Sequence, residues 1–441
     1  MRRPLRRSRL AAGLPLAAIA ALSAPLPAQA EAGPVAAWVD GQLDELETFY
    51  RDLHRHPELS FHEDDTAARL AKALRARGVE VTTGVGGTGL VGVLRSGDGP
   101  VGMLRADLDA LPIAEETGLP YASTIRAESA DGRAIGVMHA CGHDLHMTNL
   151  LGTAAWFAAH PDQWSGTLLF LGQPAEERAG GAKAMLADGL FERFPRPAFG
   201  LALHCEPLLP TGTIGTRPGP LMAAVDSVDV TLFGRGGHGA APHRTIDPIV
   251  LAAQYVLALQ TIVSREIDPV QPALITVGSI HAGSKHNIIS DRCQLQLTVR
   301  SYDPAVRTHL HDAIVRKAEA LAAAAGAPPP TVEFSEPTGP LVNDDAVTAT
   351  VQAALREALG DAHVATVPPQ MVAEDFGRFG AAGIPICMLR LGVTAPDRLA
   401  ALQAAGGPPA LHSSGFYPDA RDALATGVPA TVAALRALLA R

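Results

Sequence analysis

Apolar and polar positions alternate along the chain in two distinct periods. From Val35 to Arg77 the apolar residues recur at helical spacing, which predicts two helices near the start of the chain. Four short apolar runs that end in polar or turn-forming residues predict buried strands at 101–112, 166–177, 199–207 and 384–392. Helical segments such as 144–159 separate these runs, and Asp144 is a suitable N-cap. Buried strands alternating with helices predict an α/β fold with a mostly parallel sheet.

Residues 225–338 follow a different order. Their pattern predicts strand, helix, strand, strand, helix and strand, which is the ferredoxin-like α+β arrangement. Because this segment interrupts the α/β pattern, we expect an inserted domain at 225–338. The segments 31–224 and 339–441 would then form the two parts of one split domain.

The first thirty residues have the organisation of a secretory signal peptide. Five arginines precede an apolar, alanine-rich run, and the small-x-small sequence AQA ends at Ala30. We expect residues 1–30 to be removed and the protein to be exported to the periplasm or the extracellular space. An organellar transit peptide is the alternative, and the pair Arg6–Arg7 leaves the export route open between Sec and twin-arginine. No later window offers the ~20 uninterrupted apolar residues of a spanning helix, so we expect no membrane anchor.

Composition excludes some classes of partner. The chain carries 36 Lys and Arg against 45 Asp and Glu, a formal net charge of −9, and loss of residues 1–30 with their five arginines would make it −14. An acidic chain lacks the excess of Lys and Arg with which nucleic-acid-binding proteins neutralise phosphates. The four cysteines are too few and too irregularly spaced for a disulfide scaffold.

Polar residues at the predicted strand ends mark a candidate site. They are Asp107, Asp109, Glu176, Glu177 and His204. Ligands of parallel sheets bind beyond the carboxyl ends of the strands. Cys141 and His143 in HACGHD and His412 in LHSSG add further ligand types. Cysteine, histidine and glutamate together suit zinc or a similar transition ion. One cysteine, three histidines and one glutamate of the Glu176–Glu177 pair make five ligands, which fit two ions that share one ligand better than a single catalytic zinc.

Cys141 allows other interpretations. In an exported chain it could form a disulfide, it could be a nucleophile with His143 as its base, or it could be an inert buried residue. A nucleophile would leave the remaining candidate ligands without a role. Asp107 and Asp109 would orient metal-binding histidines, or they would simply form turns.

Six motifs, taken in order, closely resemble those of the M20 metallopeptidases. They are RHPELSFHE, RADLDALP, HACGHDLHM, PAEE, GGHGAAPH and AEDF. The chain is most similar to the amidohydrolase subfamily of hippurate hydrolases, N-acyl-amino-acid amidohydrolases and auxin-conjugate hydrolases. The resemblance implies a catalytic domain with two divalent metal ions (Zn²⁺, Mn²⁺ or Co²⁺) and an inserted lid and dimerisation domain. Matched by position, the implied metal ligands are Cys141, His143, Glu177, His204 and His412, with Cys141 as a bridging thiolate.

The resemblance also implies catalytic and substrate-binding roles. Glu176 would take a proton from the attacking water and pass it to the leaving amine, although a solvated acidic loop is the alternative for the glutamate pair. His238 would polarise the scissile carbonyl, while Asn287 and Arg300 would hold the substrate carboxylate. Surface or turn positions are the alternatives for these three residues. Ser290 replaces the proline of the family's NxIP stretch, a departure from the family in the loop that carries Asn287.

These observations predict an exported, metal-dependent amidohydrolase that cleaves N-acyl amino acids such as hippurate-like conjugates and releases a free amino acid. A metallo-carboxypeptidase or dipeptidase acting on small peptides is the alternative, because it could share every catalytic residue. A binding protein that keeps the fold without catalysis is disfavoured by the intact ligand set and by Glu176. We expect a homodimer in which His238 reaches the active site of the partner subunit.

Overall fold

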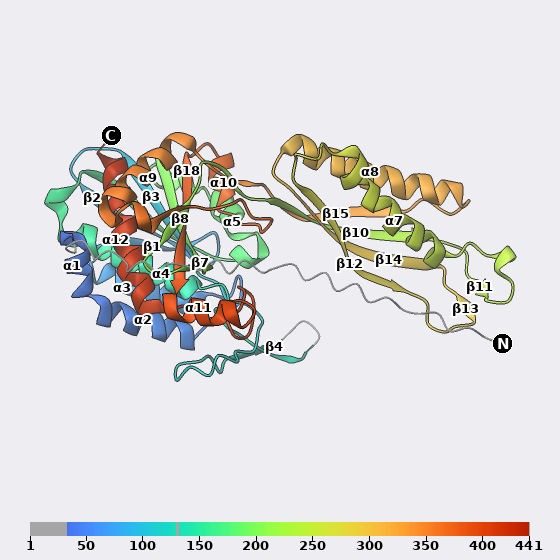
Figure 1. Ribbon diagram of the computed structural model, residues 1–441, viewed down its shortest axis with the longest axis horizontal. Coiled ribbons are helices and arrows are strands. Elements are labelled where there is room, and N and C mark those ends of the chain that lie inside the picture. The colour runs from blue at the N-terminus through green and yellow to red at the C-terminus, as the bar shows by residue number, and fades with distance from the viewer. Residues whose placement is uncertain (1–32, 129–131, 441) are drawn as a thin grey trace, which may run out of the picture.

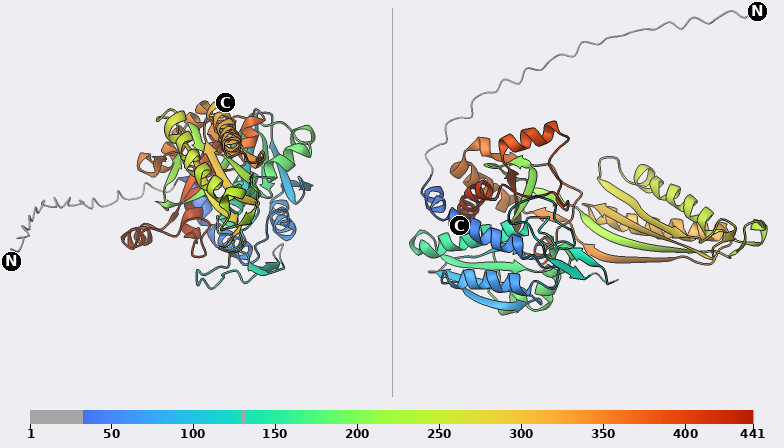
Figure 2. Two further views of the ribbon diagram at one scale, coloured as in Figure 1. Left: turned by 90° about the vertical axis from the view of Figure 1, so that its right-hand side faces the viewer. Right: turned by 90° about the horizontal axis from the view of Figure 1, so that it is seen from below.

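The computed structural model describes residues 33–128 and 132–440, which form two lobes (Figure 1). The expected signal peptide, residues 1–30, lies outside the described residues. The larger lobe is an α/β body built from both ends of the described chain, and the smaller lobe projects from it as a sheet with helices on one face (Figure 2).

The sheet of the larger lobe has the strand order β1-β2-β6-β3-β7-β18-β8-β17. Its central strands come from the four apolar runs and are mutually parallel: β6 (Gly166–Gln173), β3 (Val101–Asp107), β7 (Phe199–Pro210) and β18 (Ile386–Thr394). The outer strands are β1 (Glu80–Val85), β2 (Gly89–Ser96), β8 (Ile214–Thr216) and β17 (Val364–Thr366). The β1–β2, β2–β6 and β18–β8 pairs are antiparallel, so the sheet is mixed with a parallel centre.

The two faces of this sheet pack into separate cores. Along β6, Leu168 and Phe170 belong to one core while Leu169 and Leu171 belong to the other, as the two-residue period of a strand requires. One face is covered by α1 (Pro34–Asp40), α2 (Leu43–Arg55), α3 (Asp64–Arg75), α4 (His143–Ala159), α9 (Asp345–Leu359) and α12 (Ala420–Leu439). The other is covered by α5 (Gly181–Ala187), α6 (Leu190–Arg193) and α10 (Gly377–Ala381). Burial on both faces explains why the central strands are almost wholly apolar.

The smaller lobe has the ferredoxin-like order of elements. They are β10 (Ala224–Phe233), α7 (Pro248–Glu266), β12 (Ala273–Ala282), β14 (Arg292–Ser301), α8 (Pro304–Ala324) and β15 (Thr331–Thr338). Its sheet has the order β12-β14-β10-β15 with every neighbouring pair antiparallel, and it packs on α7 and α8 in a core of its own. Both helices start with an Asp-Pro pair, in which Asp247 or Asp303 caps the backbone and proline takes the first helical position.

Shorter elements complete the two lobes. They are β4 (Arg126–Glu128) with β5 (Ala134–Gly136), β9 (Gly219–Met222) with β16 (Leu341–Asn343), β11 (Gly237–His238) with β13 (Ile288–Ile289), and α11 (Pro396–Ala404).

Length and apolar composition alone would allow α7 and α12 to cross a membrane. In α12, 72% of the most apolar stretch is buried inside the larger lobe, and core helices satisfy the same criterion. In α7, 33% of that stretch is buried, so its outer face is exposed. Neither helix is strong evidence for a membrane span.

The helix α4 begins one residue earlier than its sequence predicts. It starts at His143, and Gly142 occupies the N-cap position with a left-handed φ of 79°. The expected Asp144 cap was therefore wrong, because the left-handed turn at the glycine sets the start of the helix. Asp144 lies in the first turn, where its carboxylate instead accepts a hydrogen bond from His54 Nδ1 at 2.7 Å.

Replacement of Gly142 by alanine is expected to lower the free energy of unfolding more than the same replacement of Gly78. Their φ angles are +79° and +80°, so both variants carry a left-handed strain of about 1–2 kcal/mol. A Cβ at position 142 would lie 2.6 Å from Cys205 Sγ, whereas a Cβ at position 78 meets nothing within 4 Å. Overpacking against Cys205 should add about 1–3 kcal/mol to the loss of unfolding free energy in the Gly142 variant. Urea denaturation measures both variants, and equal losses would contradict the close contact with Cys205.

Candidate metal centre and active site

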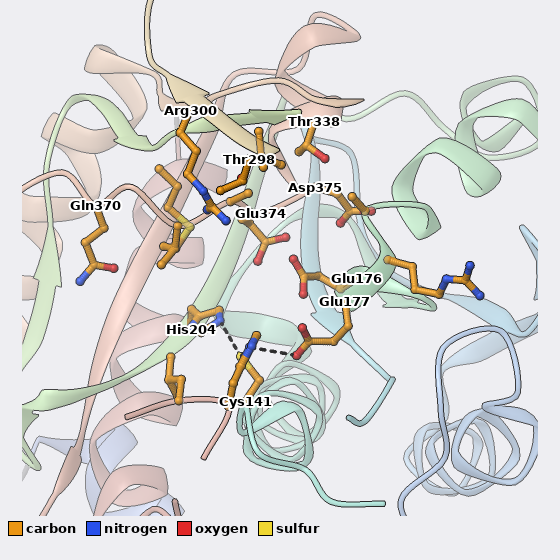
Figure 3. A pocket seen from close by; sticks show the side chains of 18 of the residues that line it. Cys141, Glu176, Glu177, His204, Thr298, Arg300, Thr338, Gln370, Glu374 and Asp375 are labelled. Carbon is orange, nitrogen blue, oxygen red and sulfur yellow. Dashed lines mark hydrogen bonds and ion pairs between the residues drawn. The ribbon is translucent and has the colours of Figure 1, made fainter. Parts of the chain in front are cut away.

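The candidate site lies at the carboxyl ends of the central strands, in a pocket of about 500 Å³. The larger lobe contributes Cys141, Glu176 and His204, and the smaller lobe contributes Thr298 and Arg300 from β14 (Figure 3). Ligands of parallel α/β sheets bind at this edge. The pocket is therefore shared between the two lobes.

Cys141 belongs to two groups of metal-binding side chains. Its Sγ lies 3.6 Å from His204 Nε2, and His143 completes the first group. The same Sγ lies 3.3 Å from His412 Nε2, and Glu177 completes the second group. Within each group the ligand atoms lie within 4.8 Å of one another. A thiolate common to both groups is the arrangement expected of two ions that share one ligand.

Hydrogen bonds to the protein orient the two buried histidines. His143 Nδ1 donates to the carbonyl oxygen of Asp109 at 2.8 Å, and His204 Nδ1 donates to the carbonyl oxygen of Cys205 at 2.8 Å. These bonds leave Nε2 of each ring directed at the other ligands. Burial and the charge of Arg390 hold the pKa of His204 well below its ordinary value, so its ring is neutral, the form that binds metals.

The fifth ligand, His412, comes from a loop near the C-terminus. Its φ of 64° is left-handed, and its backbone N–H donates to the carbonyl oxygen of Ala140 at 2.9 Å. Its Nε2 lies 3.4 Å from Glu177 Oε1, and its side chain is 51% exposed. His412 therefore forms the open wall of the candidate metal centre.

The loop that carries Glu176 and Glu177 is strained and held by buried carboxylates. Ala175 and Ala179, on either side of the pair, have left-handed φ angles of 48° and 51°, an unfavourable conformation for residues with a Cβ. The backbone N–H groups of Glu176 and Glu177 donate to Asp109 at 3.1 and 3.0 Å. The N–H of Ala175 donates to Glu63 Oε1 at 2.8 Å. These bonds aim both glutamate side chains into the pocket.

Glu176 lies beside a buried cluster of charges. Its carboxylate forms a close group with Glu374 and Asp375, and Arg105 compensates these acids through bonds to Glu374 at 2.7 Å and to Asp375 at 3.2 Å. Burial, followed by the charges of Glu374 and Glu177, raises the pKa of Glu176 well above its ordinary value. A carboxylate with a raised pKa accepts a proton more readily, which suits a general base.

The donor set fits a pair of divalent ions. Nε2 of His143 and Oε1 of Glu177 are buried, and within the described chain neither has a hydrogen-bond partner. Burial and the neighbouring Glu177 raise the pKa of the Cys141 thiol, and nearby aspartates raise the pKa of His143 to about 10 against the effect of burial. Metal binding would therefore displace protons from both residues.

Comparison with known proteins identifies the family. The sequence profile of peptidase family M20/M25/M40 matches residues 103–401, which is more than half of the chain. The chain belongs to this family. Its M20 relatives include both amidohydrolases and peptidases. Membership therefore shows that the chain is a metal-dependent hydrolase, but it does not distinguish an amidohydrolase from a peptidase.

Three curated M20 relatives illustrate this range. N-acetyl-L-cysteine deacetylase of Bacillus subtilis is 39% identical over 75% of this chain and 76% of its own. Thermostable carboxypeptidase 1 of Saccharolobus solfataricus is 40% identical over 75% and 81%, and hippurate hydrolase of Campylobacter jejuni is 38% identical over 76% and 85%. Among solved structures, the B. subtilis YXEP protein, a dinuclear metal binding peptidase from the M20 family, matches with a TM-score of 0.74 and 30% identity, covering 91% of this chain and 99% of that one.

In this M20 chain the structure does not bring every candidate residue into the pocket. Arg300 lines it and donates from Nη1 to the carbonyl oxygen of Met371 at 2.7 Å. His238 and Asn287 lie in the β11–β13 region at the far end of the smaller lobe (Figure 1), where both are exposed. The N–H of Gly239 donates to Asn287 O at 2.9 Å, so the two residues lie near each other but away from the ligands of their own chain.

Several residues that shape the site received no individual role from the sequence. Arg105 lies in RADLDALP, Glu374 and Asp375 lie in AEDF, and Glu63 ends RHPELSFHE, motifs that indicate the family without giving these residues a task. The available signal was a charged residue inside a buried apolar run, as with Arg105 in VGMLRAD. The alternative of a Cys141 disulfide is not supported, because all four cysteines are free and buried.

Substitution of Cys141 by alanine is expected to remove at least one of two bound ions together with activity. A bridging thiolate contributes to both groups of ligands, whereas a nucleophile would leave them intact. Elemental analysis of the purified variant measures this directly. Cys293→Ala is the matched control, because Cys293 is also buried and free but lies in the smaller lobe. A Cys141→Ala enzyme that kept all its metal and lost turnover would indicate nucleophilic catalysis instead.

Proposed function

We propose that this chain is an exported, metal-dependent amidohydrolase that cleaves the amide bond of N-acyl amino acids and releases the free amino acid. The observation that carries the proposal is the position of Glu176 beside two ligand groups that share Cys141, in one pocket with Arg300. The names of the deacetylase and of hippurate hydrolase support this substrate class.

Each part of the pocket has a chemical task in this proposal. Cys141, His143, Glu177, His204 and His412 would hold two divalent ions, Zn²⁺, Mn²⁺ or Co²⁺. When bound, such a pair supplies Lewis-acid activation of water and of the scissile carbonyl.

Glu176 moves the proton. Its carboxylate removes a proton from the attacking water and later donates it to the nitrogen of the leaving amine, so no covalent intermediate with the protein is needed. Arg300 pairs with the carboxylate of the substrate and fixes the amide relative to Glu176.

A metallo-carboxypeptidase or dipeptidase is the second candidate. The similarity to a thermostable carboxypeptidase favours it, and peptide hydrolysis requires the same base and ligands. Kinetics on hippurate and N-acetyl amino acids, compared with free dipeptides and with peptides blocked at the N-terminus, separates the two. A higher kcat/KM on peptides than on every acyl amino acid would replace the first proposal by the second.

Glu176→Gln is expected to retain its metals and to lose at least ~10²-fold in turnover. General acid–base catalysis contributes on this scale, and glutamine keeps the size of the side chain while it removes the base. Metal content and turnover are measured on the same preparation. Turnover close to wild type would exclude Glu176 as the base.

We further propose that the active site is completed by a second copy of the chain. The strand β12 forms an edge of the smaller sheet, and the outer face of α7 exposes Val250 and Leu257 at 54% and 71%. An edge strand and an apolar helix face are surfaces that pair with another chain. Such a dimer would allow His238, which lies far from its own pocket, to act in the pocket of the partner.

Mixing His238→Ala subunits with Glu176→Gln subunits tests this arrangement. If His238 acts across the dimer, a heterodimer has one pocket with both lesions and one intact pocket, so it should regain up to half of the wild-type turnover. Each homodimer alone should be defective, and His238→Ala should lose roughly 10²–10³-fold, the effect of removing one oxyanion donor. Verified heterodimers without recovery would place the action of His238 in its own subunit.

Export is proposed from residues 1–30 alone. Expression of the full chain in a Gram-negative host should yield a mature protein that begins at Glu31 and is recovered in the periplasmic fraction, because AQA ends at Ala30. N-terminal mass spectrometry reads the cleavage position. A cytoplasmic protein with an uncleaved N-terminus would contradict export.

A further inference from the structure

Two buried arginines near the pocket differ in how completely their nitrogens are bonded. In Arg105, Nε, Nη1 and Nη2 each donate to a side-chain oxygen, at 2.9, 2.7 and 2.7 Å. In Arg390, Nη2 donates to Glu206 Oε2 at 2.8 Å, while Nε and Nη1 have no hydrogen-bond partner within the described chain. Arg390 is only 3% exposed, so these nitrogens are also shielded from bulk water.

Arg390 lies in the wall of the pocket, next to a candidate metal ligand. The pairing of β18 with β7 places Arg390 opposite His204, and both residues line the pocket. Arg390 is the one charged residue of β18, a strand that is buried along its whole length. A guanidinium stays charged in proteins, and burying its N–H groups without acceptors is unfavourable. Because Arg390 lines the pocket, a group of a bound substrate is the acceptor that can approach its guanidinium.

Glu206 and Gln370 hold this guanidinium in place. The same Glu206 oxygen that binds Arg390 also accepts from Gln370 Nε2 at 2.9 Å. Gln370 itself lines the pocket, on the side of His204 and away from Glu177 (Figure 3). Arg390 is therefore fixed on the His204 side of the pocket, away from Glu177, with unused donors in a defined orientation.

We propose that Arg390 binds a second carboxylate of the substrate, in addition to the one that pairs with Arg300. The two arginines come from different lobes, β18 and β14, so they can hold two separate anionic groups of one molecule. A buried guanidinium in this protein already binds several carboxylates, since Arg105 contacts three at 2.7, 2.7 and 3.2 Å. The planar fork of arginine suits such bidentate pairing. The inference rests on the proposed function, and it narrows the substrate to N-acyl amino acids with two carboxylates.

The second carboxylate can belong to either half of the substrate. It is the side chain of an acidic amino acid, or it is the far end of a dicarboxylic acyl group. N-acetyl-L-glutamate against N-acetyl-L-glutamine tests the first source, and N-succinyl-L-alanine against its terminal amide tests the second. In each pair a carboxylate is replaced by an amide of nearly the same size.

The wild-type enzyme should prefer the acid over the amide in one of these pairs by roughly 10- to 100-fold in kcat/KM, the scale of a hydrogen bond to a charged group. Arg390→Gln should abolish that preference, chiefly through KM, and should leave the amide substrates within about threefold. Arg390→Lys should restore part of the preference, because it keeps the charge without the fork. Metal content should stay at the wild-type level in both variants. Arg69→Gln is the control, since it breaks a pair with Asp52 outside the pocket.

The possible failures are distinguishable. If the wild type hydrolyses neither acids nor amides, the proposed function fails. If it hydrolyses them without preference for either acid, the proposed function stands and the role of Arg390 is wrong. The role is also wrong if Arg390→Gln slows acids and amides equally, because such a loss reflects support of His204. If Arg390→Gln does not fold because Glu206 is left unpaired, the double variant Arg390→Gln/Glu206→Gln takes its place, since it removes both charges. The comparison of acid with amide substrates on the wild-type enzyme needs neither variant.

Discussion

The buried carboxylate of Asp109 connects the parts of the candidate active site. It accepts the backbone N–H groups of Glu176 and Glu177 and the hydroxyl of Ser60 at 2.6 Å, and the carbonyl of the same residue orients His143. Burial alone would raise the pKa of Asp109, but hydrogen bonds from His143 and Ser60 outweigh it and lower the pKa. Through its carboxylate and its backbone carbonyl, Asp109 thus positions the proposed base and two candidate metal ligands, and its hydrogen bonds offset the strain of the loop that carries Glu176 and Glu177.

A site with this many buried acids needs compensating charge. Arg105 supplies it from the middle of the sheet, where it binds Asp107, Glu374 and Asp375. Asp107 in turn accepts from His146 Nδ1 at 2.7 Å, so His146 is engaged behind the ligands rather than among them. Isolated charges at this depth would be strongly unfavourable, whereas a connected cluster is tolerated and keeps each carboxylate in one orientation. Burial, together with the charges at the margin of this cluster, raises the pKa of Glu176.

The sequence predicted the centre of the fold better than its edges. The four buried runs became the four parallel strands because burial on both faces leaves an uninterrupted apolar signal. Glu177 follows the end of β6, but β7 extends to Pro210, so His204, expected at a strand end, lies within the strand. Among the outer strands, β8 and β17 are only three residues long and therefore carry little apolar signal. The support given by Glu63 and Arg105 depends on contacts between residues far apart in the chain, 112 positions for Glu63 and Ala175. The order of apolar and polar residues along the chain does not show which distant residues come into contact.

The two lobes contribute different groups to the pocket. The larger lobe carries the candidate metal ligands and the proposed base, and the smaller lobe carries Arg300, which would bind the carboxylate of the substrate. The candidate ligands and Glu176 belong to the larger lobe, where His204 lies on β7, His143 begins α4, and buried hydrogen bonds fix the loop of Glu176 and Glu177. Arg300 lies on a different sheet with its own core, so a movement between the lobes would change the distance from a bound carboxylate to Glu176 without altering the metal ligands. His238 is farther still, at the end of the smaller lobe. A substrate that contacts both lobes would therefore complete the site by bridging them, and binding energy away from the scissile bond would contribute to its alignment.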